Sequence, residues 1–330
     1  MESAAIGIYL RTGHRGGVGL MDGFWTSPRF RPLWLGLALL VCGLTSSAPV
    51  KAASGRVFIE EGAVKRSALI VEFQRLKRGP RPTIIVLHGG SGNGAGVRRN
   101  LGLDEVARAT GSIMIYPDAV EGRWAGANAG RAGLADDSIY LGRLVQKLIA
   151  ERISDPQKIS IVGVSTGGLM AIRMACTQPR LFAAAAAIIA NMPKSLEGAC
   201  KPERPVPFLL INGTADTLIP YQGGRIALAN RTAEVLSTEA TLAAFAEAAG
   251  CGTGRSSEPV THRDAADPTH TFIERATGCK APVELIKVDG GGHRVPGRLG
   301  GGGGNANAGA RSNDIDAGKA VLEFIKRAGG

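Results

Sequence analysis

Aromatic residues are scarce in this sequence, and charge of one sign never accumulates in long runs. Phe, Trp and Tyr make up 5% of the 330 residues. Modules that bind sugars or solid polymers depend on stacking aromatic side chains, so we expect no such module here. There is no run of six like charges and no stripe of basic and aromatic residues, so we expect no nucleic-acid partner. We interpret the net charge of +11 as a solvated basic surface, with attraction to anionic polymers as the alternative.

The apolar stretch near the N-terminus, Leu33–Leu44, is short for a membrane span, with about 12 residues. Two arginines precede it, and Ala52 ends a segment with small residues where a signal peptidase cuts. The pattern predicts an N-terminal extension and signal peptide over residues 1–52, cleaved after Ala52. We therefore expect a secreted or periplasmic protein with no permanent membrane anchor. A second methionine, Met21, is an alternative start of the chain.

Cysteine is also scarce, with five residues in the chain. Cys42 lies within the predicted signal, where a lipoprotein signal is the alternative interpretation. The remaining four are Cys176, Cys200, Cys251 and Cys279. An even number in an exported chain favours disulfides. Four cysteines allow three pairings, of which Cys176–Cys200 and Cys251–Cys279 join neighbours in sequence; buried free thiols are the alternative.

Apolar β-branched runs alternate with helical patterns along residues 53–330. Strands are predicted at 56–60, 67–73, 83–87, 112–116, 158–164, 184–189, 206–212 and 283–288, and helices at 103–110, 136–152, 166–175, 237–249 and 314–327. The alternation predicts a single α/β domain with a doubly wound, mostly parallel sheet. The alanine run at 184–189 has high helix propensity, and only the alternation makes it a strand. Residues 251–279 are predicted to be an insertion closed by two cysteines, and 300–304 to be a flexible loop.

The segment Gly163-Val164-Ser165-Thr166-Gly167 has the pattern G-x-S-x-G. It follows an apolar strand and precedes a helical pattern, which is the context of a nucleophile elbow. The sharp turn needs small neighbours and presents the serine hydroxyl above the carboxyl end of the sheet. Ser165 is therefore the predicted nucleophile.

A serine hydroxyl needs a base to take its proton, and the base is usually a histidine oriented by a carboxylate. His293 follows the last predicted strand, and Asp216 follows the strand at 206–212. The order Ser165, Asp216, His293 is the order of an α/β-hydrolase triad. Asp289 is the alternative acid, but it ends the same strand as His293, which suits a loop-capping role better.

A glycine-rich loop, His88–Gly94, follows the strand at 83–87. It lacks the patterns of a phosphate-binding loop, so we interpret it as part of an oxyanion hole. The expected donors are the backbone N–H groups of Thr166 and of Gly90, or alternatively Ser91.

Two further histidines, His262 and His270, share a polar loop with Asp264 and Asp267. The loose spacing favours solvated residues, with a metal site as the alternative. We expect no metal and no organic cofactor.

The sequence resembles the secreted poly(3-hydroxybutyrate) depolymerase and feruloyl esterase family of α/β-hydrolase serine esterases over about residues 60–327. The resemblance is carried by Leu87-His88-Gly89-Gly90, Tyr116-Pro117-Asp118, Trp124, Asp136-Asp137, Gly163-Val164-Ser165-Thr166-Gly167-Gly168, Asn212-Gly213-Thr214-Ala215-Asp216, Ile219-Pro220-Tyr221, Gly223-Gly224 and Gly290-Gly291-Gly292-His293.

This resemblance implies hydrolysis of carboxylic esters through an acyl-enzyme at the same triad, in a disulfide-bonded exported enzyme. Trp124 and Val295 are expected to line the substrate pocket; Val295 stands where the family often has Trp, and Ser138-Ile139 replaces the usual pair after the Asp doublet. The family's Ser/Thr-rich linker and polymer-binding domain are absent, so the expected partner is a small or oligomeric ester. An acyltransferase and a catalytically silent binding protein are the alternatives.

Overall fold

The computed structural model describes residues 53–61, 64–73, 79–126, 136–228, 231–297 and 308–329. The predicted signal peptide and the glycine run at 300–304 lie outside these residues, as does part of the loop that follows Trp124. The described residues all belong to one unit of the chain, Ala52–Gly330. None of its described helices has the length and apolar character needed to cross a bilayer.

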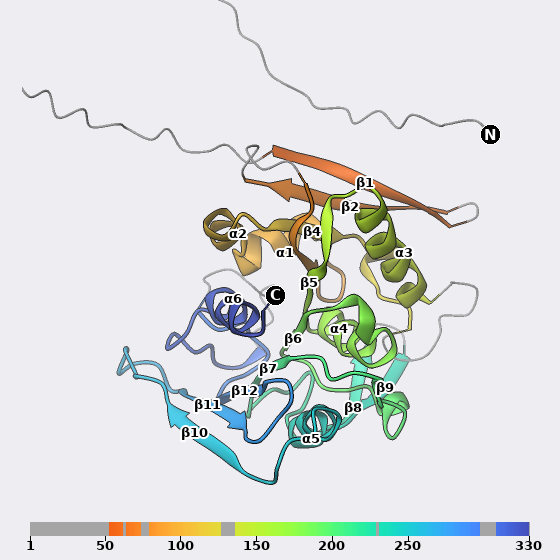
Figure 1. Cartoon of the computed structure of the whole chain (residues 1–330). Helices are drawn as coiled ribbons and strands as arrows, with labels where there is room; N and C mark the ends of the chain where they lie inside the picture. Colours follow the sequence, from red (N-terminus) through yellow and green to blue (C-terminus); the bar gives the residue numbers. More distant parts are fainter. Residues whose placement is uncertain are drawn as a thin grey trace, which may run out of the picture. The chain divides into compact units, whose positions relative to one another are not determined.

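Ten strands form one sheet in the order β1-β2-β4-β3-β5-β6-β7-β12-β11-β10 (Figure 1). Their bounds are β1 Ala53–Glu61, β2 Val64–Glu72, β3 Arg81–Leu87, β4 Ile113–Pro117, β5 Ser154–Val164, β6 Ala184–Ile188, β7 Phe208–Gly213, β10 Arg255–Pro259, β11 His270–Ala276 and β12 Val283–Asp289. The strands from β4 to β12 in this order pair in parallel, and the two edges pair antiparallel. The predicted doubly wound, mostly parallel α/β sheet is confirmed.

Helices cover both faces of the sheet (Figure 1). They are α1 Gly94–Leu101, α2 Asp104–Thr110, α3 Asp137–Ala150, α4 Thr166–Thr177, α5 Thr238–Ala248 and α6 Ala317–Arg327. One apolar core lies between the sheet and α3, α4 and α5, and the other between the sheet and α1, α2 and α6. Because successive side chains of a strand point to opposite faces, each central strand contributes to both cores.

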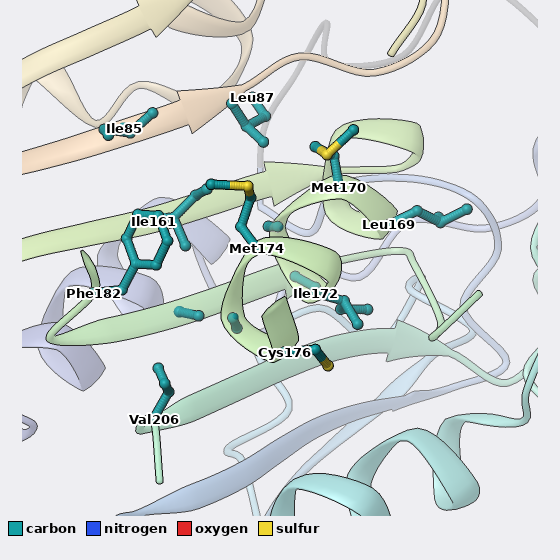
Figure 2. Packing of buried hydrophobic residues seen from close by; sticks show 14 of the residues in the cluster. Ile85, Leu87, Ile161, Leu169, Met170, Ile172, Met174, Cys176, Phe182 and Val206 are labelled. Carbon is teal, nitrogen blue, oxygen red and sulfur yellow. The ribbon is translucent and has the colours of Figure 1, made fainter. Parts of the chain in front are cut away.

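Strand β3 illustrates this division. Ile84 and Val86 belong to the core beneath α6, while Ile85 and Leu87 belong to the core beneath α4. Figure 2 shows Leu87 close to Met170 of α4. All these side chains are at most 3% exposed, and burying such a side chain contributes about 1.5–3 kcal/mol. The two cores hold β5 and α4 rigidly, which fixes the position of the turn between them.

Three segments differ from the expectations. Helix α1 begins within the glycine-rich loop, where Asn93 Oδ1 accepts a hydrogen bond from Gly96 N as the N-cap. The segment between Cys251 and Cys279 forms β10 and β11, which extend the sheet beyond β12. A separate hairpin, β8 Gly224–Leu228 and β9 Arg231–Val235, was not predicted. The alanine run is a strand, as expected, because it is buried between β5 and β7.

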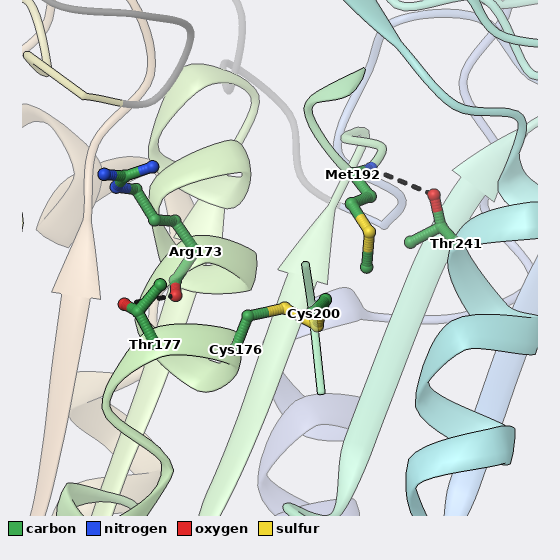
Figure 3. Close-up of a disulfide and its surroundings, with 6 residues drawn as sticks. All are labelled: Arg173, Cys176, Thr177, Met192, Cys200 and Thr241. Carbon is green, nitrogen blue, oxygen red and sulfur yellow. Dashed lines mark hydrogen bonds between the residues drawn. A yellow bond between two sulfur atoms is a disulfide. The ribbon is translucent and has the colours of Figure 1, made fainter. Parts of the chain in front are cut away.

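Two disulfides join the cysteine pairs that are neighbours in sequence. Cys176, at the end of α4, is bonded to Cys200 in the segment before β7 (Figure 3). Cys251 is bonded to Cys279, and this bond closes the segment that contains β10 and β11. The first disulfide ties α4, and with it the elbow, to the chain that leads into β7.

Replacing Cys176 and Cys200 together by alanine is expected to lower the free energy of unfolding by about 3 kcal/mol. The disulfide closes a loop with a sequence separation of 24, and opening it gives the unfolded chain more conformations. Equilibrium urea unfolding of the oxidised protein and the variant measures the difference. An unchanged unfolding midpoint and slope would contradict the expectation.

Candidate active site

Ser165 lies at the turn between β5 and α4, with φ 54° and ψ −121°. These angles are costly for a residue with a side chain, and such strain occurs at sites whose surroundings hold it in place. Here Ser165 N donates to Ile188 O at 2.9 Å. A Cβ on Gly163 would lie 2.0 Å from Gly167 O, so strand and helix approach more closely than any other residue would allow. The turn has the geometry of a nucleophile elbow.

The structure brings together the three residues of the predicted triad. His293 Nε2 lies 2.9 Å from Ser165 Oγ, and His293 Nδ1 lies 2.7 Å from Asp216 Oδ2. In the neutral tautomer that fits both contacts, Nδ1–H donates to the carboxylate and Nε2 accepts from the serine hydroxyl. The side chains of His293 and Asp216 are 12% and 3% exposed. This arrangement can move a proton from Ser165 to His293 while the carboxylate stabilises the imidazolium.

Both carboxylate oxygens of Asp216 have hydrogen-bond partners that fix the orientation of the side chain. Asp216 Oδ1 accepts hydrogen bonds from Leu218 N and Ile219 N, each at 2.8 Å. This oxygen is therefore held by the backbone, and Oδ2 remains turned toward His293. The carboxylate has one orientation, which in turn sets the orientation of the imidazole ring.

The acid loop and the histidine loop are joined through their backbones. Ala215 N donates to Gly291 O at 2.8 Å, and a Cβ on Gly213 would lie 2.2 Å from that same oxygen. Asp289, the alternative acid, is exposed and accepts a hydrogen bond from Thr214 Oγ1 at 2.9 Å. It braces the turn between the two loops, as its position in the sequence suggested.

A buried amide network behind the acid loop was not recognised in the sequence. Asn212 Oδ1 accepts from Ala190 N, and its Nδ2 donates to Asn191 Oδ1. Asn191 Nδ2 in turn donates to Pro220 O at 2.9 Å. The network connects the ends of β6 and β7 to the far end of the Asp216 loop. Asn residues at strand ends are common in turns, so their type alone carries no signal of this role.

The glycine-rich loop is anchored through His88, which is 1% exposed. His88 Nε2 accepts a hydrogen bond from Ala119 N at 3.1 Å, and Nδ1 lies 2.7 Å from Gly89 O. The two contacts together require the neutral ring with the proton on Nδ1. Burial lowers the pKa of His88 below its ordinary value, while the contact with Gly89 O opposes that shift.

The two expected substrate-pocket residues, Trp124 and Val295, are buried and belong to the two apolar cores. Trp124 is 3% exposed, and its Nε1–H donates to His88 O at 2.8 Å. Val295 is 5% exposed and belongs to the core beneath α6. Trp124 therefore holds the glycine-rich loop from behind, because an indole N–H that is buried needs an acceptor.

The structure selects between the two donors expected from the glycine-rich loop. Ser91 N donates to Gly122 O at 3.0 Å, so this N–H group already has an acceptor and Gly90 is favoured over Ser91. Gly90 N and Thr166 N have no hydrogen-bond acceptor among the described residues. A Cβ on Gly90 would lie 3.7 Å from Thr166 Cγ2, so the two residues are adjacent. Their two N–H groups are the candidate oxyanion donors.

The Asp doublet at 136–137 has a structural role. Asp136 Oδ1 accepts from Ser138 N and so caps α3, and its Oδ2 forms an ion pair with Arg173 at 2.5 Å. Asp137 is 1% exposed and pairs with Arg66 at 2.6 Å. Neither carboxylate contacts the Ser165–His293 pair.

The polar loop with His262 and His270 places the two imidazole rings 4.8 Å apart. His262 Nδ1 lies 3.1 Å from Asp314 Oδ1, and Asp267 Oδ1 accepts from Thr269 N at 2.9 Å. Within the described parts of the chain, no three His, Cys, Asp or Glu side chains are grouped as metal ligands. Asp264 and Asp267 cap turns of this loop, and Asp314 from another segment contacts His262.

The neutral state of His88 predicts a pH dependence of stability. The folded-state pKa lies below the ordinary value of 6.5, so the unfolded chain binds a proton that the folded chain does not. The free energy of unfolding should therefore fall as the pH falls below about 6.5, by up to about 1.4 kcal/mol per pH unit. Urea unfolding between pH 5 and 7 measures the slope. The variant His88→Gln should lack this contribution, and equal slopes in both proteins would contradict the prediction.

Comparison with known proteins finds relatives named as esterases and solved structures of a similar fold. The Prolyl oligopeptidase family matches residues 136–195, which include the elbow. "Putative esterase NocK" of Nocardia uniformis subsp. tsuyamanensis is 33% identical over 232 residues, which cover 66% of each protein. "Feruloyl esterase B" of Piromyces equi is 32% identical over 118 residues, 34% of this chain and 22% of that protein. "Feruloyl esterase C" of Emericella nidulans is 25% identical over 62% of this chain and 65% of its own length.

Among solved structures, the acetyl xylan esterase from Aspergillus awamori is similar in fold. It has a TM-score of 0.56 and 16% sequence identity, and the alignment covers 82% of this chain and 99% of that one. The matches span just under two thirds of the length of the NocK relative and about a fifth of feruloyl esterase B. The sheet and the elbow define an α/β-hydrolase. Within this class, the relatives that the chain resembles are named as esterases.

Proposed function

We propose that this protein is an exported carboxylic ester hydrolase that acts through an acyl-enzyme at Ser165. The observation that carries the proposal is the continuous hydrogen-bonded chain from Ser165 Oγ through His293 to Asp216. The relatives that the chain resembles are named as esterases, which supports hydrolysis of carboxylic esters. No step of this chemistry needs a metal or an organic cofactor.

The reaction proceeds in two halves. In the first, Ser165 Oγ bonds to the acyl carbon while its proton moves to His293 Nε2, and the carbonyl oxygen becomes an oxyanion. The N–H groups of Gly90 and Thr166 hold this oxyanion. The bond to the alcohol then breaks, and the proton passes from His293 to the leaving oxygen. In the second half, His293 Nε2 takes a proton from water, and the water oxygen bonds to the acyl carbon. The bond between the acyl carbon and Ser165 Oγ then breaks, the proton passes from His293 to Oγ, and the carboxylic acid leaves.

The proposed substrates are soluble esters: hydroxybutyrate oligomers, feruloyl esters or acetylated sugars. Relatives that are named feruloyl esterases support the second of these. The mature protein should be assayed with p-nitrophenyl acetate, methyl ferulate and a hydroxybutyrate trimer, and labelled with a fluorophosphonate. Hydrolysis of at least one ester and labelling at Ser165 would support the proposal. Absence of both would overturn it, and ester exchange that outpaces hydrolysis when an alcohol is added would instead indicate an acyltransferase.

Export is part of the proposal and has its own support. The two disulfides are typical of proteins from oxidising compartments. N-terminal sequencing of the exported protein should begin at Ala53 or within about two residues of it, as signal-peptidase cleavage requires. A mature protein that retains Leu33–Leu44 would contradict cleavage.

A further inference from the structure

A cavity of about 240 Å³ lies at the amino ends of β3 and β5, beneath α6. Its lining residues include Ile84, Lys158 and Ser160 from the strands and Leu322, Ile325 and Lys326 from α6. The cavity is at the opposite end of the parallel strands from the triad, since Lys158 and Ser160 precede the carboxyl end of β5 and Ser165 follows it. It is therefore separate from the site described above.

The interior of this cavity combines an apolar wall with three buried hydroxyl groups, those of Thr83, Ser112 and Ser160. Thr83 Oγ1 donates to Ser154 Oγ, and Ser112 Oγ is hydrogen-bonded to Thr110 Oγ1. Ile84, Leu322 and Ile325 are each at most 3% exposed and form the wall. Ser160 is 1% exposed, and its Oγ has no hydrogen-bond partner among the described residues. Buried hydroxyl groups in proteins almost always have a partner. The cavity is large enough for a ligand of several heavy atoms that supplies one.

The outer part of the cavity is positively charged. Lys158 and Lys326 are both exposed and line it from β5 and α6. Neither lysine forms an ion pair with a described residue, whereas Lys147 and Lys194 on other surfaces do. Two unpaired ammonium groups beside an apolar wall favour an anionic group on a hydrophobic body.

The spacing of these groups restricts the ligand further. Lys158 and Ser160 are two residues apart on one strand, so their side chains lie on the same face, about 7 Å apart at the backbone. A ligand that reaches both must carry its anionic group and a second polar group at opposite ends. We propose that this cavity binds a small hydroxycarboxylic acid. Its carboxylate lies between Lys158 and Lys326, its apolar body lies against Ile325, and its hydroxyl bonds to Ser160 Oγ.

Calorimetric titration with 4-hydroxybenzoate tests the proposal, with benzoate and 4-hydroxybenzyl alcohol as matched probes. The mature protein should bind 4-hydroxybenzoate more tightly than either, since each comparison probe lacks one polar end. Replacing both lysines by alanine should weaken binding by about tenfold or more, because two charge-assisted contacts are lost. The variant Ser160→Ala should weaken the binding of 4-hydroxybenzoate by about fivefold, because one hydrogen bond is lost. It should weaken the binding of benzoate, which has no hydroxyl, by less than about twofold.

Controls distinguish binding in this cavity from binding elsewhere on the protein. The double variant Lys201→Ala/Lys319→Ala removes the same charge from exposed positions that do not line the cavity, and it should bind as the unaltered protein does. Phosphonylation of Ser165 should leave binding unchanged. Three results would overturn the proposal. Binding could disappear after phosphonylation, or it could survive the loss of both Lys158 and Lys326. Inorganic phosphate could also displace 4-hydroxybenzoate as well as benzoate does. If Ser165 resists phosphonylation, the proposed esterase function fails. The lysine and Ser160 variants then still test whether the cavity binds the hydroxycarboxylic acid.

Discussion

Ser165→Ala is expected to lower ester turnover by about 10⁴-fold or more while the fold is retained. The variant keeps the backbone N–H groups of Gly90 and Thr166 but has no nucleophile to form the acyl-enzyme. Alanine adds no atoms at a position whose backbone is already fixed by the contact with Ile188 O. The measurement is kcat for the most rapidly hydrolysed ester of the panel, with circular dichroism to compare the folds.

His293→Ala should cost about as much as the loss of Ser165, because an unactivated hydroxyl attacks an ester poorly. Groups that act as one unit do not give additive losses. The double variant Ser165→Ala/His293→Ala is therefore expected to be little slower than Ser165→Ala. Wild-type turnover in Ser165→Ala would remove Ser165 as the nucleophile, and additive losses would show that the two residues act separately.

Much of the fold and the placement of the site could be predicted because strong local signals coincide. The apolar run of β5, the glycine at 163 and the helical pattern after Ser165 each fit one turn geometry, and the structure has that turn. Asp216 and His293 were placed by a topological argument, since parallel strands bring their carboxyl ends to one edge of the sheet. The distances between their atoms follow from backbone contacts between loops that are 77 residues apart in sequence.

The parts that could not be predicted depend on contacts between distant segments. Ser91 N is occupied by Gly122 O, and Trp124 turns its indole N–H toward His88 O. Neither contact follows from a pattern within the glycine-rich loop itself. The resemblance placed Trp124 and Val295 in a substrate pocket, but a motif position does not specify which way a side chain points. The β8–β9 hairpin has no strong alternation of apolar residues and was missed for that reason.

The site is supported from several sides by parts of the chain that do not touch the triad. Trp124 and Ala119 hold the glycine-rich loop through His88, and the Asn191–Asn212 pair holds the acid loop through Pro220. A reaction that depends on the position of an oxyanion donor and an imidazole ring needs both loops to be fixed before substrate binds. The buried polar groups around the site supply this support.

Asp216→Asn is expected to lower turnover by about 10⁴-fold, somewhat less than the loss of Ser165. An amide still accepts from Leu218 N and Ile219 N through its oxygen, so the loop keeps its shape. Its NH₂ group then faces His293 Nδ1 and favours the wrong tautomer, with the proton on Nε2, which cannot accept from Ser165.

Asp289→Asn is the matched control, because it makes the same chemical change at an exposed carboxylate on the neighbouring turn. Its amide oxygen can still accept from Thr214 Oγ1, so most of the turnover should remain. The measurement is kcat and kcat/KM for both variants and the unaltered protein at one fixed pH. If Asp289→Asn causes the large loss of kcat and Asp216→Asn causes only a small one, the acid of this site is Asp289. The contact of 2.7 Å between Asp216 and His293 would then have no catalytic role.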